Sequence, residues 1–229
     1  MFAAAYFQHY PLMSRDPGGE LDGNSVLYAG TYALICRKLY GRYVDAKDYE
    51  YNLYKFIEVK PGVICRGGKP QDPQTHDDYI GLCTLSGLTA EKKAATEVYE
   101  YGKANCWSYV NVAYSFKDLF NAQFWRLPGV VQHIKICAGK SWSWFDYLLF
   151  IVSVLTNAFT AKNSTSGKIL TWHMVTMYEL LGDRFWLADK AVAFWKHRIL
   201  KMYPNAMGDV FGIYFGKDHV FAKYTIGII

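Results

Sequence analysis

Three side chains that can take part in acid–base chemistry stand side by side at His76, Asp77 and Asp78, directly before Tyr79 and an apolar segment. Another acidic residue, Asp22, precedes a Gly-Asn pair. Glycosidases use two carboxyl groups, one as an acid and one as a base or nucleophile. The pattern therefore makes Asp22 and Asp77 or Asp78 candidate catalytic carboxylates of a saccharide-cleaving enzyme. His76 and Tyr79 are the matching candidates for substrate binding.

A helix start explains the same residues without any chemistry. Either His76 or Asp77 can cap a helix, and the helix dipole favours Asp78 in its first turn. Asp22 can close an Asx turn before a further helix. A third interpretation is a polar joint in an assembly, so the function of these residues stays open at the level of sequence.

Two further positions have side chains suited to ligand binding. Trp125 and Arg126 can bind a ring face and an anionic group, or else serve as an aromatic anchor and a capping arginine. His173 lies inside an expected helix, where a core histidine is commoner than a ligand. The six histidines have no metal-binding spacing, and no nucleotide-binding or serine-hydrolase motif is present. We therefore expect no metal and no cofactor.

Composition limits the classes of protein to which the chain can belong. Its 229 residues favour a single domain over 1–229, and an aromatic fraction of 17% suits a deep core, a sugar platform or a protein interface. The net charge of +5 is scattered rather than grouped, so no specific nucleic-acid partner is expected. Five widely spaced cysteines and a first segment without a basic region indicate reduced thiols and synthesis in a cytoplasm.

Capping residues, glycines and prolines predict about ten helices and no strand. One of them starts at Asp45 and ends before Pro61. Another starts at Thr89, which caps it. The full set of expected spans is 25–41, 45–60, 77–86, 89–105, 115–118 onward, 128–139, 142–159, 164–182, 183–203 and 206–215. Short links make consecutive helices antiparallel pairs.

The stretch 142–159 is the most apolar of the chain, but it is barely long enough to cross a bilayer and it contains Asp146. We therefore expect a helix buried on all sides rather than a membrane span. Such a helix suits the inner wall of a ring of helix pairs. The fold class expected is all-α, an open or closed α/α toroid-like arrangement, with 1–20 and 221–229 as interface arms.

The order of DGNSVLY, VKPG, HDDYIGL, FWRLPG and IYFGKDH resembles a group of uncharacterised proteins encoded by tailed bacteriophages. The helical layout is also similar in outline to the α/α toroid of some glycoside hydrolases and polysaccharide lyases. The first resemblance implies a virion component made in the host cytoplasm.

Two functions follow from these observations. The first is a structural component of a bacteriophage particle, in the neck, tail or capsid, whose partners are other virion proteins or copies of itself. The alternative is a carbohydrate-active hydrolase or lyase that uses the aspartate pair in an aromatic cleft, with a saccharide as partner.

Overall fold

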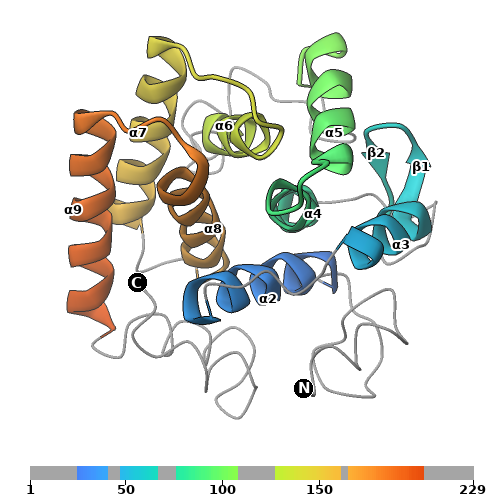
Figure 1. Ribbon diagram of the computed structural model, residues 1–229. Helices are drawn as coiled ribbons and strands as arrows, with labels where there is room; N and C mark the ends of the chain where they lie inside the picture. Colours follow the sequence, from blue (N-terminus) through green and yellow to red (C-terminus); the bar gives the residue numbers. More distant parts are fainter. Residues whose placement is uncertain (1–24, 41–46, 67–75, 108–126, 161–164, 204–229) are drawn as a thin grey trace. The chain divides into compact units, whose positions relative to one another are not determined.

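The computed structural model describes residues 25–40, 47–66, 76–107, 127–160 and 165–203 (Figure 1). These residues form eight helices and one small two-stranded sheet, which confirms a mostly helical fold. The expected helices near 115 and over 206–215 lie outside the described residues. The helices are α2 (Ser25–Tyr40), α3 (Lys47–Ile57), α4 (His76–Gly87), α5 (Lys93–Ala104), α6 (Leu127–Cys137), α7 (Trp144–Thr160), α8 (Thr165–Leu181) and α9 (Trp186–Met202).

The chain divides into two compact units. The first comprises 1–113 with 137–139, and the second comprises 114–136 with 140–229. The first holds α2 to α5 and the sheet, and the second holds nearly all of α6 together with α7, α8 and α9. This division does not test whether 1–229 is a single domain, so that expectation stays a prediction.

In the first unit, α4 packs against α2, α5 and α3. Two glycines allow α2 and α4 to approach closely, because a Cβ at Gly30 would lie 2.3 Å from the carbonyl oxygen of Gly81. A Cβ at Gly81 would lie 2.4 Å from the carbonyl oxygen of Val26. The crossing therefore brings the two backbones into contact, and α4 is buried along nearly its whole length.

The prediction that the second helix continues to Lys60 is wrong. Helix α3 ends at Ile57, and strand β1 (Glu58–Lys60) then pairs antiparallel with β2 (Val63–Ile64). The turn depends on Gly62, whose φ of 79° is open to glycine at little cost. The N–H of Gly62 donates to the hydroxyl of Tyr54 at 2.9 Å, which ties the turn back to α3.

The expected start of the fourth helix at Thr89 is also wrong, since α5 begins at Lys93. Thr89 accepts a hydrogen bond from the N–H of Lys92 at 3.1 Å, in the turn before the helix. The N–H groups of the first turn are instead satisfied from other helices. Glu50 of α3 accepts from Ala94 at 3.4 Å, and Ser86 of α4 accepts from Ala95 at 3.0 Å.

In the second unit, α7 packs against both α8 and α9, and α7 and α9 lie side by side (Figure 1). Side-chain contacts join their corresponding ends: the ring of Tyr147 contacts Phe185 at 4.9 Å, and the indole of Trp195 donates to Asn157 at 2.7 Å. Helices α7 and α9 therefore run parallel. The helix ends expected at Gly182 and before Pro204 are confirmed, because α8 ends at Leu181 and α9 at Met202.

Candidate protein-interaction surface

The acidic cluster found in the sequence lies at the start of α4. The helix begins at His76, so Asp77 and Asp78 occupy its first turn, where the helix dipole favours a carboxylate. Asp78 and Tyr79 are buried, whereas His76 and Asp77 are half-buried. Burial lowers the pKa of His76 below its usual value.

The other residues of the predicted saccharide site, Asp22, Trp125 and Arg126, lie outside the described residues. No separation between Asp22 and the α4 carboxylates follows from the structure. The catalytic roles of Asp22, Asp77 and Asp78 and the binding roles of the neighbouring residues stay predictions. The exposed fraction of Asp78 is 0%, so a polysaccharide cannot reach its carboxylate without a rearrangement of α4.

The prediction that the helix over 142–159 is buried on all sides is wrong. Helix α7 buries one face, which carries six residues: Asp146, Phe150, Ser153, Val154, Asn157 and Ala158. Its opposite face is open, with exposed fractions of 73% for Trp144, 58% for Phe145 and 64% for Phe159. The packed face carries the polar residues Asp146, Ser153 and Asn157, whereas the open face is apolar, so the rule that apolar faces are buried gives the wrong side of this helix.

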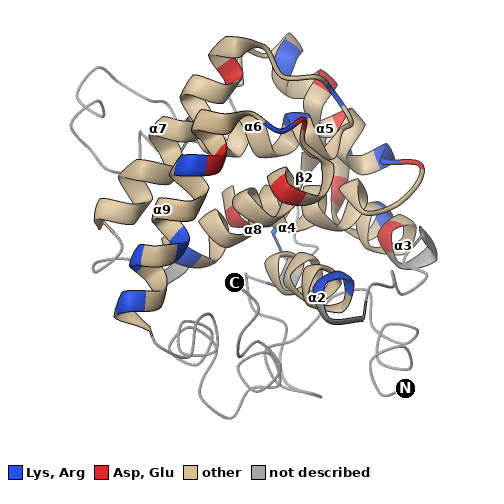
Figure 2. Cartoon of the chain, turned by 60° about the vertical axis from the view of Figure 1, so that its left-hand side comes forward, with Lys and Arg blue, Asp and Glu red and all other residues tan. Residues whose placement is uncertain are grey.

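We call the open side the outer face of α7. Its members lie within about 60° of one direction when successive residues turn by about 100°. They are Trp144, Phe145, Leu148, Val152, Leu155 and Phe159, of which Val152 and Leu155 are half-buried. The only charged residue of α7 is the buried Asp146 (Figure 2), so α7 itself contributes no charge to the outer face.

The outer face continues onto α9. The rings of Phe159 and Phe194 lie 5.7 Å apart, and Leu187 stands two turns before Phe194 on the same side of α9. Both α9 residues are exposed, at 42% for Leu187 and 39% for Phe194. The guanidinium of Arg198 covers the ring of Phe159 at 5.5 Å and marks the polar edge of the surface.

A network around Asp146 fixes the start of α7. Ser143 and Asp146 form a capping box: the N–H and Oγ of Ser143 each donate to Asp146 at 2.7 Å, and the N–H of Asp146 donates to the Oγ of Ser143 at 3.3 Å. From α6, Lys135 donates to Asp146 at 2.5 Å and Gln132 donates at 2.8 Å. Burial alone would raise the pKa of Asp146, but these hydrogen bonds outweigh it and hold the pKa below its usual value.

Beneath the first turn of α7 lies an aromatic cluster that links all three long helices of the second unit. The ring of Trp142 stacks on Tyr178 of α8 at 5.6 Å and contacts Phe150 at 5.1 Å. Tyr147 contacts both Trp142 and Phe185. These contacts hold the N-terminal ends of α7 and α9 beside the C-terminal end of α8.

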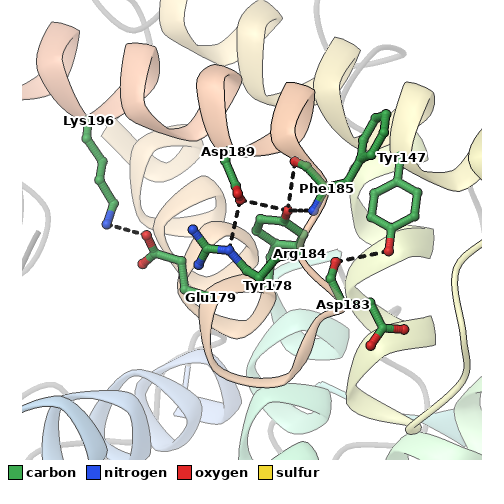
Figure 3. A network of polar contacts seen from close by, with 8 residues as sticks. All are labelled: Tyr147, Tyr178, Glu179, Asp183, Arg184, Phe185, Asp189 and Lys196. Carbon is green, nitrogen blue, oxygen red and sulfur yellow. Dashed lines mark hydrogen bonds and ion pairs between the residues drawn. The ribbon is translucent and has the colours of Figure 1, made fainter.

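Polar contacts close the turn between α8 and α9 (Figure 3). The hydroxyl of Tyr178 accepts from the N–H of Phe185 at 2.9 Å and donates to Asp189 at 2.9 Å. Arg184 forms an ion pair with Asp189 at 2.9 Å, and the hydroxyl of Tyr147 donates to the carbonyl of Asp183 at 2.9 Å. Burial, with a contribution from Asp189, raises the pKa of Tyr178 to about 12, so this hydroxyl keeps its proton near neutral pH.

The remaining titratable groups of the described residues lack the grouping of a metal site. In the described part of the chain, no cluster of three or more histidine, cysteine or carboxylate side chains is placed to hold a metal ion. His173 is fully buried, as expected for a core histidine, and burial with the nearby His133 lowers its pKa well below the usual value. No described helix combines the length and apolar character needed to cross a membrane.

Comparison with protein-family models, curated proteins and solved structures finds no match to this chain. The local geometry must therefore carry the functional argument. Among the described residues, the feature that stands apart from ordinary packing is the uncharged outer face of α7.

The sequence analysis did not identify this surface, although part of its signal was present. Phe145, Leu148, Val152, Leu155 and Phe159 follow one another at spacings of 3, 4, 3 and 4 residues. This is the a/d pattern of a coiled-coil seam. A seam of this kind ordinarily marks the packed side of a helix, so the sequence predicts burial for it rather than exposure. The capping box at Ser143 and Asp146 was readable as well and was missed.

Proposed function

We propose that the chain is an interaction subunit of a larger protein assembly and that it docks through the outer face of α7. The observation that carries this proposal is the exposure of large apolar side chains at both ends of one side of a helix whose other side is packed, with half-buried apolar residues between them. Soluble monomers seldom leave such a surface open, and contiguous apolar patches mark interaction sites.

The size of the surface supports this role. Aromatic side chains have areas of roughly 150–250 Å², so the exposed fractions of the outer face, Leu187 and Phe194 amount to roughly 600 Å² of apolar surface. This is at the upper end of the largest patch on a typical monomer and close to the roughly 800 Å² that each partner contributes to a standard interface.

The assembly that we propose is a tailed-bacteriophage particle, with the chain as a neck, tail or capsid accessory component. This choice of assembly rests on the sequence resemblance rather than on the outer face of α7. The scaffold we propose for it is an α/α toroid-like arrangement of helix pairs. The parallel α7 and α9, with α8 running back between them in sequence, support this proposal as one up-and-down set of helices.

The test is incorporation into particles from infected host cells, separated by sedimentation. We expect the wild-type chain in the particle fraction and the double variant Phe145→Glu/Leu148→Glu among free proteins. Both positions are exposed, so these changes should cost little stability. Lys103→Glu, at an exposed charged position on α5, is the control and should incorporate normally. A wild-type chain absent from particles, or a double variant that incorporates fully, would refute the proposal.

A further inference from the structure

We propose that the partner of the outer face of α7 is the same face of a second copy of this chain, packed as an antiparallel pair of helices about a twofold axis near Val152. This inference rests on the proposed function, because it names the occupant of the surface described there.

The first reason is the absence of charge. A partner recognised by charge complementarity needs charged residues opposite it. The 17 residues of α7, about 25 Å long, place none on the outer face, and Arg198 of α9 adds a charge at its Phe159 end. A matching partner must therefore be uncharged and apolar over a similar length. Among the described helices, α7 itself presents an open face of this kind.

The second reason is the spacing of the face. Phe145, Leu148, Val152, Leu155 and Phe159 occupy successive a and d positions of a heptad pattern. Residues at these positions insert between those of a second helix with the same pattern. A twofold axis then makes the contact closed and self-complementary, since each copy offers the same patch to the other.

The antiparallel direction follows from the ends of the face. Trp144 and Phe159 are large aromatic residues at opposite ends, and Leu148 and Leu155 lie between them. In an antiparallel pair, Trp144 of one copy lies near Phe159 of the other, so that each bulky end meets a different side chain. A parallel pair would place two Trp144 rings against each other and would align the helix dipoles unfavourably.

The C-terminal segment of the same chain fits this face less well. Charged residues interrupt 204–229 at positions 209, 217, 218 and 223, which leaves no uncharged run longer than the seven residues 210–216. As a helix, seven residues span about 10 Å, less than half of the face. As an extended strand, they would leave backbone N–H and C=O groups unpaired against an apolar helix.

The area sets the expected strength of the dimer. Two faces of roughly 600 Å² bury about 1,200 Å² in total, at the lower limit of stable interfaces. We therefore expect association in the micromolar range rather than a permanent dimer.

The experiment is sedimentation equilibrium of the full chain from about 1 µM to about 100 µM, a range that covers weak association. We expect the mass to rise from 26.2 kDa towards twice that value. The double variant Leu148→Glu/Leu155→Glu should weaken association at least about 100-fold, because it buries four charges in the dimer. Leu200→Glu is the matched control, since Leu200 and Leu148 are both 42% exposed and Leu200 lies about 120° around α9 from Phe194.

Cross-linking tests the register. With Cys106 replaced by serine, because it is the exposed native thiol among the described residues, Val152→Cys should form a disulfide-linked dimer on mild oxidation. The same substitution at Lys103 on α5 should not.

Four results would overturn the proposal. The first two are a wild-type chain that stays monomeric throughout the range, and association that is unchanged by the double variant. The third is dimerisation that appears only after deletion of 204–229, which would make that segment the occupant. The fourth is a monomer that binds uncharged phosphatidylcholine vesicles in a Leu148-dependent way, which would make the face a lipid contact. A dimer that is absent from particles would refute the proposed function alone, and a monomer that enters particles through this face would refute the dimer alone.

Discussion

Replacement of Asp146 by asparagine tests whether the buried network positions the first turn of α7. The substitution keeps the shape but removes the charge that accepts hydrogen bonds from Lys135 at 2.5 Å and from both donors of Ser143 at 2.7 Å. Side-chain exposure in this ion pair is only 20% for Lys135 and 10% for Asp146, so solvent screens it weakly. Hydrogen bonds to charged groups contribute about 1.5–3 kcal/mol each, and the asparagine oxygen retains part of this. We expect the free energy of unfolding to fall by about 2–3 kcal/mol.

Urea unfolding at a series of pH values measures this loss and checks its cause. The folded-state pKa of Asp146 lies below its unfolded value of about 3.9, so the charge stabilises the fold above that pH. The stabilisation is lost as the pH falls through the folded-state pKa. The difference between wild type and Asp146→Asn should therefore be constant from pH 5 to pH 7 and shrink below about pH 4.

The control for this comparison is Arg184→Gln, which breaks an ion pair whose arginine side chain is 55% exposed. Exposed pairs contribute about 0.2–1 kcal/mol, so this variant should lose well under half as much stability as Asp146→Asn. Equal losses in the two variants, or a loss in Asp146→Asn that persists unchanged at pH 3, would show that the buried charge does not hold the helix start.

Three further predictions concern packing and buried polar groups. Gly81→Ala should lower the free energy of unfolding by about 2 kcal/mol in thermal melts, because its Cβ would lie 2.4 Å from the carbonyl oxygen of Val26. Burial lowers the pKa of His173, so the unfolded state binds the proton first; stability should fall as the pH drops below about 6.5, and His173→Gln should flatten that slope in urea titrations. Trp195→Phe removes the 2.7 Å hydrogen bond to buried Asn157 and should cost about 1–3 kcal/mol, whereas Trp195→Phe with Asn157→Leu should recover part of the loss.

Local signals in the sequence predicted most helix positions well. The ends before Gly182 and Pro204 are confirmed, and the short helix expected over 77–86 is α4. These features depend on residues within a turn of the boundary, where glycine, proline and first-turn acids act through the local backbone. The errors arise where a distant part of the chain supplies the contact. Glu50 satisfies the start of α5 from 44 residues away, and no local pattern could reveal it.

The candidate surface shows the same division. Sequence determined that residues 144–160 form one long, nearly uncharged helix, because its apolar side chains and the capping box at Ser143 act along a single stretch of chain. Only the tertiary structure decided which side of that helix is packed and which is open. The packed side holds the polar residues Asp146, Ser153 and Asn157, so its burial does not follow from hydrophobicity but from the directions in which α8 and α9 approach the helix. Those directions are fixed by contacts such as Trp195 with Asn157 that join residues far apart in the chain.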